Sequence, residues 1–224
     1  IGCSSRLPAY TSVYGFHGLH GRALPIATGL KVVRPDLTVL AVSGDGDCFS
    51  IGTNHFIHAC RRNVDMTLIV MDNHIYGMTK GQVSPTTEAG SEDKLSAHDL
   101  DVQPLRPLAL ALVSGASYIA RGYSGESKQL TEILTGAIQH CGFSVVHVLC
   151  ECITYCPGQK EWKKLVQPFA EEMTSDQAKA NQIIKQDNGL QTGVVYKTDR
   201  MVWPGATSQP AMQSLDELDK QFIH

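Results

Sequence analysis

Residues 44–87 read GDGDCFSIGTNHFIHACRRNVDMTLIVMDNHIYGMTKGQVSPTT, and the pattern around them decides the fold class. The apolar run LTVLAV at residues 37–42 comes just before them and predicts a buried parallel strand. Ser43 and Gly44 end that run, so the Gly-Asp-Gly tripeptide at 44–46 falls where a strand passes into a loop.

A second strand is predicted at residues 66–71, MTLIVM, which lead into Asp72 and Asn73. Residues 54–61 carry apolar side chains at helical spacing and indicate a helix between the two strands. A strand, a helix and a second parallel strand bring two carboxyl ends to the same edge of one sheet. We therefore expect Asp45 and Asn73 to lie close together.

The residue types at these strand ends suit a magnesium ion and a diphosphate. Glycines on both sides of Asp45 allow a sharp turn and a close approach of the backbone to phosphate. The carboxylate of Asp45 is a hard oxygen ligand for Mg²⁺, and Asn73 adds a neutral amide oxygen. Two residues further along offer a close-approach backbone and a hydroxyl to the same phosphates, Gly77 and Thr79.

The rest of the chain alternates helical and strand patterns. Helices are predicted from about Arg22 to 31, at 108–114 and at 127–141, and strands at 118–121 and 144–149. Such alternation predicts an α/β fold, with a mainly parallel sheet and helices on both faces. The polar residues 88–107 predict a mobile loop over the site or against a partner, and helical spacing recurs near 175–184 and 212–222.

Five blocks follow one another in the order found in a known family: GCSSR (2–6), HGRALPIATGLK (20–31), GDGD (44–47), RRNVDMTLIVMDNHIYGMTKGQVSPT (61–86) and ECITYCPG (151–158). Gly-Asp-Gly followed after 26 residues by Asn73 is the pattern of thiamine diphosphate enzymes. Together the blocks resemble the beta subunits of 2-oxoacid:ferredoxin oxidoreductases, most closely the 2-oxoglutarate branch. Several independent blocks over residues 1–160 argue against a chance match.

The resemblance implies a thiamine diphosphate-binding domain at residues 1–160 and a polar extension at 161–224 that packs on the domain or on a partner subunit. It implies that Asp45, Asn73 and the backbone carbonyl of Ile75 hold Mg²⁺. The residues implied around the diphosphate lie at both strand ends: Gly44, Asp45, Gly46, Asp47, Asn73, Ile75, Gly77, Met78 and Thr79.

Two imidazoles and a guanidinium lie at the start of the first predicted helix, where they suit phosphate or carboxylate binding: His17, His20 and Arg22. Zinc is an alternative for the two histidines, although the remaining ligands of a zinc site are missing from the spacing. The resemblance favours His20 and Arg22 as catalytic residues that face the cofactor and substrate.

Seven cysteines make an odd number, and disulfides are not expected in a sequence without a secretory signal. Three of them lie within residues 150–156, a grouping that suits zinc, redox exchange or an iron–sulfur cluster. Cys48, Cys60 and Cys141 are predicted to be small buried hydrophobic residues.

By resemblance, Cys3 and Cys152 are ligands of a 4Fe-4S cluster, whereas Cys150 and Cys156 are not. Four thiolates normally hold such a cluster. The other two ligands are therefore expected from an N-terminal piece that precedes Ile1, and without that piece no cluster would form.

Composition limits the classes of partner. The chain has 224 residues, 42% of them hydrophobic, and a formal net charge of −3. This near-neutral balance gives no electrostatic reason to expect nucleic acid or an anionic membrane as a partner. No apolar run approaches the roughly 18 residues of a membrane span, so the cytoplasm is the expected location.

The resemblance implies oxidative decarboxylation of a 2-oxoacid, 2-oxoglutarate in the first instance, to an acyl-coenzyme A. Electrons would pass through the iron–sulfur cluster to ferredoxin, and an alpha subunit would complete the enzyme. A non-oxidative thiamine diphosphate decarboxylase or carboligase, and a non-catalytic scaffold subunit, are the alternatives. The first alternative would need Asp45 and Asn73 but neither of the two ligand cysteines.

Overall fold

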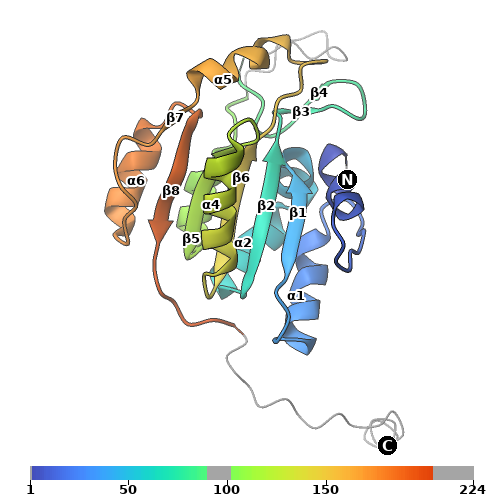
Figure 1. Cartoon of the computed structure of the whole chain (residues 1–224), viewed down its shortest axis with the longest axis vertical. Coiled ribbons are helices and arrows are strands. Elements are labelled where there is room, and N and C mark those ends of the chain that lie inside the picture. The colour runs from blue at the N-terminus through green and yellow to red at the C-terminus, as the bar shows by residue number, and fades with distance from the viewer. Residues whose placement is uncertain (1, 90–101, 204–224) are drawn as a thin grey trace, which may run out of the picture.

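The computed structural model describes residues 2–89 and 102–203, in which one six-stranded sheet forms the centre (Figure 1). The strands stand in the order β1-β2-β6-β5-β8-β7. Their bounds are Leu40–Gly44 (β1), Met66–Asp72 (β2), Tyr118–Tyr123 (β5), Phe143–Leu149 (β6), Gln167–Pro168 (β7) and Gln191–Lys197 (β8). The first four in this order run parallel, while β8 is antiparallel to β5. The predicted α/β fold with a mainly parallel sheet is confirmed.

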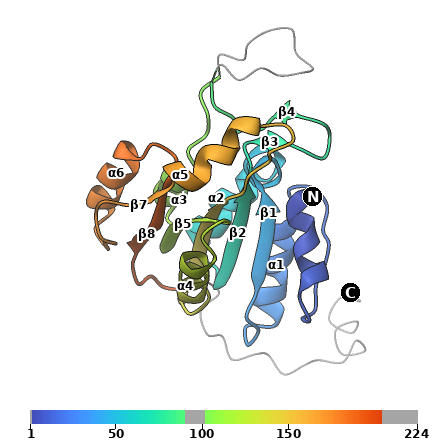
Figure 2. The same ribbon diagram turned by 45° about the horizontal axis from the view of Figure 1, so that its top comes forward.

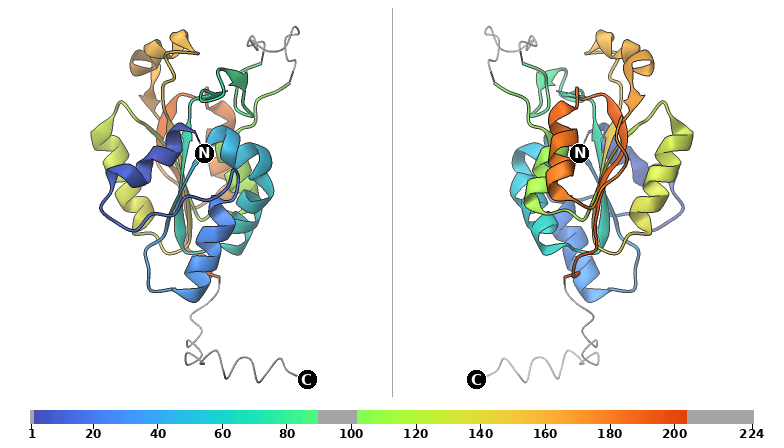
Figure 3. Two further views of the ribbon diagram at one scale, coloured as in Figure 1. Left: turned by 90° about the vertical axis from the view of Figure 1, so that its right-hand side faces the viewer. Right: turned by 90° about the vertical axis from the view of Figure 1, so that its left-hand side faces the viewer.

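Helices cover both faces of the sheet (Figures 2 and 3). Four lie on one face: α1 (Ala23–Val33), α2 (Thr53–Arg62), α3 (Pro107–Ser114) and α6 (Gln177–Gln186). The other face carries α4 (Ser127–Ile138) and the short η1 (Cys3–Tyr10) beside β1. The shorter elements are η2 (Asp47–Ile51), the β3–β4 hairpin (Ile75–Tyr76 and Gln82–Val83), η3 (Pro157–Glu161) and α5 (Trp162–Leu165). Among the described residues, no helix has the length and apolar character needed to cross a membrane.

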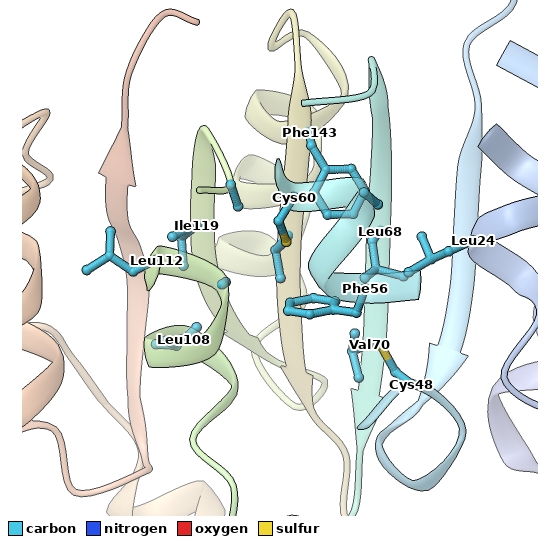
Figure 4. Close-up of a cluster of buried hydrophobic side chains, with 14 of the residues drawn as sticks. Leu24, Cys48, Phe56, Cys60, Leu68, Val70, Leu108, Leu112, Ile119 and Phe143 are labelled. Atoms are coloured by element: carbon cyan, nitrogen blue, oxygen red, sulfur yellow. The ribbon is translucent and has the colours of Figure 1, made fainter. Parts of the chain in front are cut away.

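Apolar side chains fill the space on both sides of the sheet. The larger group, between the sheet and helices α1, α2, α3 and α6, includes the fully buried Phe56, Leu68 and Phe143 (Figure 4). The smaller group lies under α4 and includes Ile133 and Val146. Burial on both faces explains why the central strands are continuous apolar runs, without the alternation of a half-exposed strand.

Local chemistry sets the helix ends. Pro107 occupies the first turn of α3, where its missing N–H costs no helical hydrogen bond, and Gly115 ends this helix with a φ of 88°. Asn63 ends α2 in the same left-handed conformation, with a φ of 55°.

Several boundaries differ from the prediction. Strand β1 begins three residues later than expected and continues through Ser43 and Gly44, because both residues pair with β2. The helix predicted at 127–141 ends at Ile138. The helix predicted near 212–222 and most of the loop predicted at 88–107 lie outside the described residues.

The C-terminal part contributes a strand that the sequence analysis did not predict. Strand β8 pairs with β5, and α6 packs against α3. The division of the chain near residue 160 stays a prediction, but the sheet continues across it.

Candidate active site at the strand ends

A cavity of about 290 Å³ lies at the carboxyl ends of β1 and β2. Asp45 and Asn73 both line it, which confirms that the two strand ends meet at one edge of the sheet. Every residue predicted around the diphosphate also lines this cavity: Gly44, Asp45, Gly46, Asp47, Asn73, Ile75, Gly77, Met78 and Thr79. Their roles as ligands stay predictions.

Asp45 is a buried carboxylate, 4% exposed, with few partners. The hydroxyl oxygen of Thr86 lies 3.1 Å from its Oδ2 and 2.8 Å from Oδ1 of Asp72, so the two carboxylates share one hydroxyl proton. Within residues 2–89 and 102–203, no lysine, arginine or histidine forms an ion pair with it. Burial and the negative charge of Asp72 raise the pKa of Asp45 to about 7. Because it is buried and has no ion-pair partner among the described residues, the carboxylate of Asp45 is a favourable ligand for a divalent cation.

Asp72, at the end of β2, lies beside Asp45 but titrates differently. Burial is the largest single effect and would raise its pKa, but the hydrogen bonds and charges of His147 and His74 together outweigh burial and lower the pKa to about 2. Asp72 therefore remains ionised, and its charge acts on Asp45.

Asn73 is held at the rim of the cavity by backbone and side-chain bonds. Its Oδ1 accepts a hydrogen bond of 3.2 Å from the amide of Ile75. Its carbonyl accepts one of 2.8 Å from Nε2 of the buried Gln159, whose Oε1 in turn accepts one of 2.6 Å from the amide of Cys152. Gln159 thus links the Asn73 turn to the cysteine segment, a role that no local sequence signal indicated.

Glycine is required at position 46 because a larger side chain does not fit there, and not because of the backbone conformation. Its φ of −64° is available to any residue. A Cβ at this position would lie 2.3 Å from Cε1 of Tyr76, whose hydroxyl donates a hydrogen bond of 3.0 Å to the Gly46 carbonyl. The Tyr76 ring therefore packs directly on the Gly46 backbone, and no Cβ fits between them.

Asp47 holds the loop that carries His20. One carboxylate oxygen, Oδ1, accepts a hydrogen bond from the amide of Gly21 and lies 2.9 Å from Nδ1 of His20. The other oxygen accepts a hydrogen bond of 2.6 Å from the hydroxyl of Ser43. Asp47 was predicted to surround the diphosphate, and the structure shows that its carboxylate positions His20, which also lines the cavity.

Arg22 lies outside the lining of the cavity. It precedes α1, and its Nη1 lies 3.3 Å from the carbonyl oxygens of Gly21 and Ile51. Its catalytic role stays a prediction. His17, the other histidine considered for zinc, is 2.9 Å from the carbonyl oxygen of Ser5.

The cysteines separate into buried and accessible groups. Cys48 and Cys60 are buried as predicted, but Cys141 is exposed because the preceding helix ends at Ile138 and leaves it on a turn. Cys3 is exposed and lines the cavity, and a Cβ at Gly77 would lie 3.5 Å from Sγ of Cys152. Cys3 therefore lines the cavity, whereas Cys152 lies outside the lining, next to Gly77, which is part of it.

The chain is similar to several known proteins. Residues 1–148 match the family described as thiamine pyrophosphate enzyme, C-terminal TPP binding domain. The chain is 46% identical over 165 residues to a 2-oxoacid:ferredoxin oxidoreductase subunit beta from Sulfolobus, covering 72% of this chain and 54% of that protein. A solved 2-oxoglutarate:ferredoxin oxidoreductase from Magnetococcus marinus superposes with a TM-score of 0.85 at 40% identity, covering 90% of this chain and 71% of that one. The chain belongs to the 2-oxoacid:ferredoxin oxidoreductase beta-subunit family.

Other members of the beta-subunit family are equally similar. The 2-oxoglutarate oxidoreductase subunit KorB of Mycobacterium tuberculosis is 48% identical over 158 residues, which are 70% of this chain and 42% of that protein. The present chain thus spans about half the length of the curated relatives that it matches. The structure from Magnetococcus marinus is described with 2-oxoglutarate, coenzyme A and succinyl-CoA bound.

The residues present fit two of the groups expected in a beta subunit of this family. The buried carboxylate of Asp45, which forms no ion pair within the described residues, and the amide of Asn73 form a donor set for Mg²⁺. Gly44, Gly46 and Gly77 line the same cavity and offer backbone to a diphosphate.

The iron–sulfur cluster is different. Among residues 2–89 and 102–203, no group of three or more histidine, cysteine, aspartate or glutamate side chains could hold a metal. Cys3 and Cys152 do not complete a set of four thiolates by themselves.

Proposed function

We propose that this chain is the thiamine diphosphate-binding part of a beta subunit that oxidatively decarboxylates a 2-oxoacid, 2-oxoglutarate in the first instance, to its acyl-coenzyme A. The proposal includes an alpha subunit as partner, ferredoxin as electron acceptor and a cytoplasmic location. One observation carries it: the buried carboxylate of Asp45 and the side chain of Asn73 line one cavity together with the backbone of Gly44, Gly46 and Gly77.

The chain's own residues have separate tasks in this function. Asp45, Asn73 and the carbonyl of Ile75 would hold Mg²⁺, and the glycines Gly44, Gly46 and Gly77 would expose backbone to the diphosphate. Thiamine diphosphate, when bound, supplies an electron sink for the carbanion left by decarboxylation. The His20 imidazole, positioned by Asp47, would hold a proton at the reacting end.

The names of the relatives support the choice of substrate and partner. Several are 2-oxoglutarate synthase or oxidoreductase subunits, and the neighbouring solved structure carries 2-oxoglutarate and coenzyme A. A subunit named beta implies an alpha partner. Cys3 and Cys152 are proposed as two cluster ligands, with the other two supplied from outside this sequence.

A turnover assay of the full subunit complex tests this function. We expect reduction of a viologen dye that requires both coenzyme A and 2-oxoglutarate, with pyruvate as the competing substrate. Replacing Asn73 with leucine should abolish it, because the substitution removes an oxygen ligand and keeps a similar volume. Coenzyme A-independent release of CO₂ without dye reduction would instead indicate the non-oxidative enzyme, and no turnover with any 2-oxoacid would leave a scaffold.

The Asp47→Ala variant should lower kcat about 100-fold, the scale of a lost proton-transfer group, while leaving Mg²⁺ affinity in place. The reason is that Asp47 bonds to His20 and Gly21 and leaves Asp45 untouched. Asp47→Asn should retain much of the activity, since its amide oxygen still accepts from Gly21. Steady-state kinetics together with calorimetric titration of Mg²⁺ separates the two effects. Equal losses in both quantities would contradict the positioning role.

A further inference from the structure

Polar side chains in three adjacent strands form a continuous line of hydrogen bonds across the sheet. Nε of Arg121 on β5 donates to Nδ1 of His147 on β6 over 3.0 Å, and Nε2 of His147 lies 2.7 Å from Oδ2 of Asp72 on β2. Arg121 and His147 are register partners, and Asp72 shares a strand face with Val70, which pairs with His147. Sheet register alone therefore brings the three groups together.

The direction of each bond follows from the chemistry of arginine. A guanidinium only donates, so Nδ1 of His147 accepts, and Nε2 carries the proton that it donates to Asp72. All three residues are at most 4% exposed. Burying ionisable groups costs more than burying apolar groups of the same size, so mere filling of the core does not account for them.

At one end the line reaches the candidate metal ligands. Thr86 places its hydroxyl oxygen 2.8 Å from Oδ1 of Asp72 and 3.1 Å from Oδ2 of Asp45. The same Oδ1 of Asp72 accepts a hydrogen bond of 2.8 Å from the amide of His74, which has a left-handed φ of 60°. Thr86 thus bridges Asp72 and Asp45, which share its one hydroxyl proton, and Asp72 also holds the turn that carries Asn73 through the amide of His74.

At the other end the line reaches the C-terminal part of the chain. Nη1 of Arg121 donates to Oδ2 of Asp187 over 2.7 Å and to the carbonyl of Gln191 over 3.2 Å. Asp187 follows α6, and Gln191 begins β8. We call the whole line the cross-sheet chain; its members are Asp187, Arg121, His147, Asp72 and Thr86.

We propose that the cross-sheet chain consists of positioning residues that fix Asp45 and the Asn73 turn in the geometry needed to bind Mg²⁺, and that the C-terminal segment thereby contributes to the metal site. This inference rests on the proposed function, because it assigns Mg²⁺ to Asp45 and Asn73. Mg²⁺ tolerates little deviation from an octahedral arrangement of its ligands. A carboxylate fits that arrangement well only when other groups fix its orientation.

The His147→Leu variant tests the proposal in the full complex with its partner subunit. At saturating thiamine diphosphate we expect Mg²⁺ affinity, measured by calorimetry, to fall about 10- to 100-fold, the usual cost of removing a group that orients a ligand. His147→Gln should recover most of that affinity, because its amide N–H can still donate to Asp72. The thermal midpoint of the metal-free complex is recorded in parallel.

The chain offers a matched control at the amino ends of strands β5 and β6. His140 is also a buried imidazole, with Nε2 2.7 Å from the hydroxyl of Ser117. His140→Leu should lower the thermal midpoint while leaving Mg²⁺ affinity unchanged. Equal Mg²⁺ affinity in wild type and folded His147→Leu would overturn the proposal.

A gentler pair of variants keeps the test decisive if His147→Leu does not fold. Thr86→Val removes the bridging hydroxyl and preserves volume, and Thr67→Val does the same at a buried threonine that bonds the Ala137 carbonyl. Weakened Mg²⁺ binding in the first variant alone supports the proposal, and equal binding in both overturns it. If the wild-type complex itself binds no Mg²⁺, the proposed function fails first, and this outcome is distinct from a failure of the cross-sheet chain.

Discussion

The Asp45→Asn variant is expected to lose Mg²⁺-dependent binding of thiamine diphosphate by more than about 100-fold, beyond the cost of losing a group that only orients a ligand. Asp45 is the buried carboxylate at the end of β1, and among the described residues it forms no ion pair. An amide keeps the shape of the side chain but removes the negative charge that attracts the cation. Calorimetric titration of the subunit complex measures the loss.

The same substitution should stabilise the metal-free protein above neutral pH. The folded pKa of Asp45 is raised to about 7 from 3.8, so the folded state binds an extra proton between these values. Stability of the metal-free wild type therefore falls as pH rises through this window, and above it the buried charge persists as a cost. The amide side chain of the Asp45→Asn variant carries no such charge, and the variant should lack this decline.

Chemical denaturation in the presence of a chelator, at about pH 5 and about pH 8, shows the difference between the two pH profiles. Added Mg²⁺ and thiamine diphosphate should restore the stability of the wild type at the higher pH and have no effect on the variant. Parallel profiles for the two proteins would show that Asp45 does not carry a buried charge in the absence of metal.

Gly46→Ala should also abolish cofactor binding, for a steric reason. The new Cβ would lie 2.3 Å from Cε1 and 2.4 Å from Cζ of Tyr76, so the ring must leave its place. The Tyr76 ring lines the cavity, and its hydroxyl donates a hydrogen bond to the Gly46 carbonyl. Displacing the ring therefore disturbs the β3 turn next to Gly77. Overpacking of this kind costs about 1–3 kcal/mol of stability in addition to the lost binding.

A second substitution, at Tyr76, should restore part of the cofactor binding that Gly46→Ala abolishes. Gly46→Ala combined with Tyr76→Leu removes the colliding ring, and thiamine diphosphate affinity should return in part. Gly29→Ala is the matched control, because a Cβ at that position in α1 meets no atom within 4 Å apart from its chain neighbours and the backbone of its own helix. The control should bind the cofactor normally and gain slightly in stability from its higher helix propensity. Failure of the double variant to improve on Gly46→Ala would mean that the collision with Tyr76 is not the reason why glycine is required there.

The sequence by itself determined the fold class and the place of the site. The apolar run at β2 reports burial on both faces, and this local signal requires no knowledge of the partner strands. The run that precedes Gly44 predicted the same for β1, but β1 lies at the edge of the sheet and buries only alternate residues, with Leu40 exposed. Because parallel strands joined by a helix place their carboxyl ends together, Asp45 and Asn73 could be assigned to one edge from the chain alone. Residue chemistry then indicated Mg²⁺ and a diphosphate.

Only the tertiary structure decided which groups support that site. Asp72 meets His147 across 75 residues, and Thr86 meets Asp45 across 41, contacts that are set by sheet register and loop closure. Strand β8 was not predicted because its sequence is polar and lacks an apolar run; pairing with β5 stabilises the strand instead. Arg22 had the right chemistry for the cavity, but the start of α1 directs its guanidinium to two backbone carbonyls. A local pattern encodes burial and strand ends, whereas the partner of a buried polar group depends on which distant strand packs beside it.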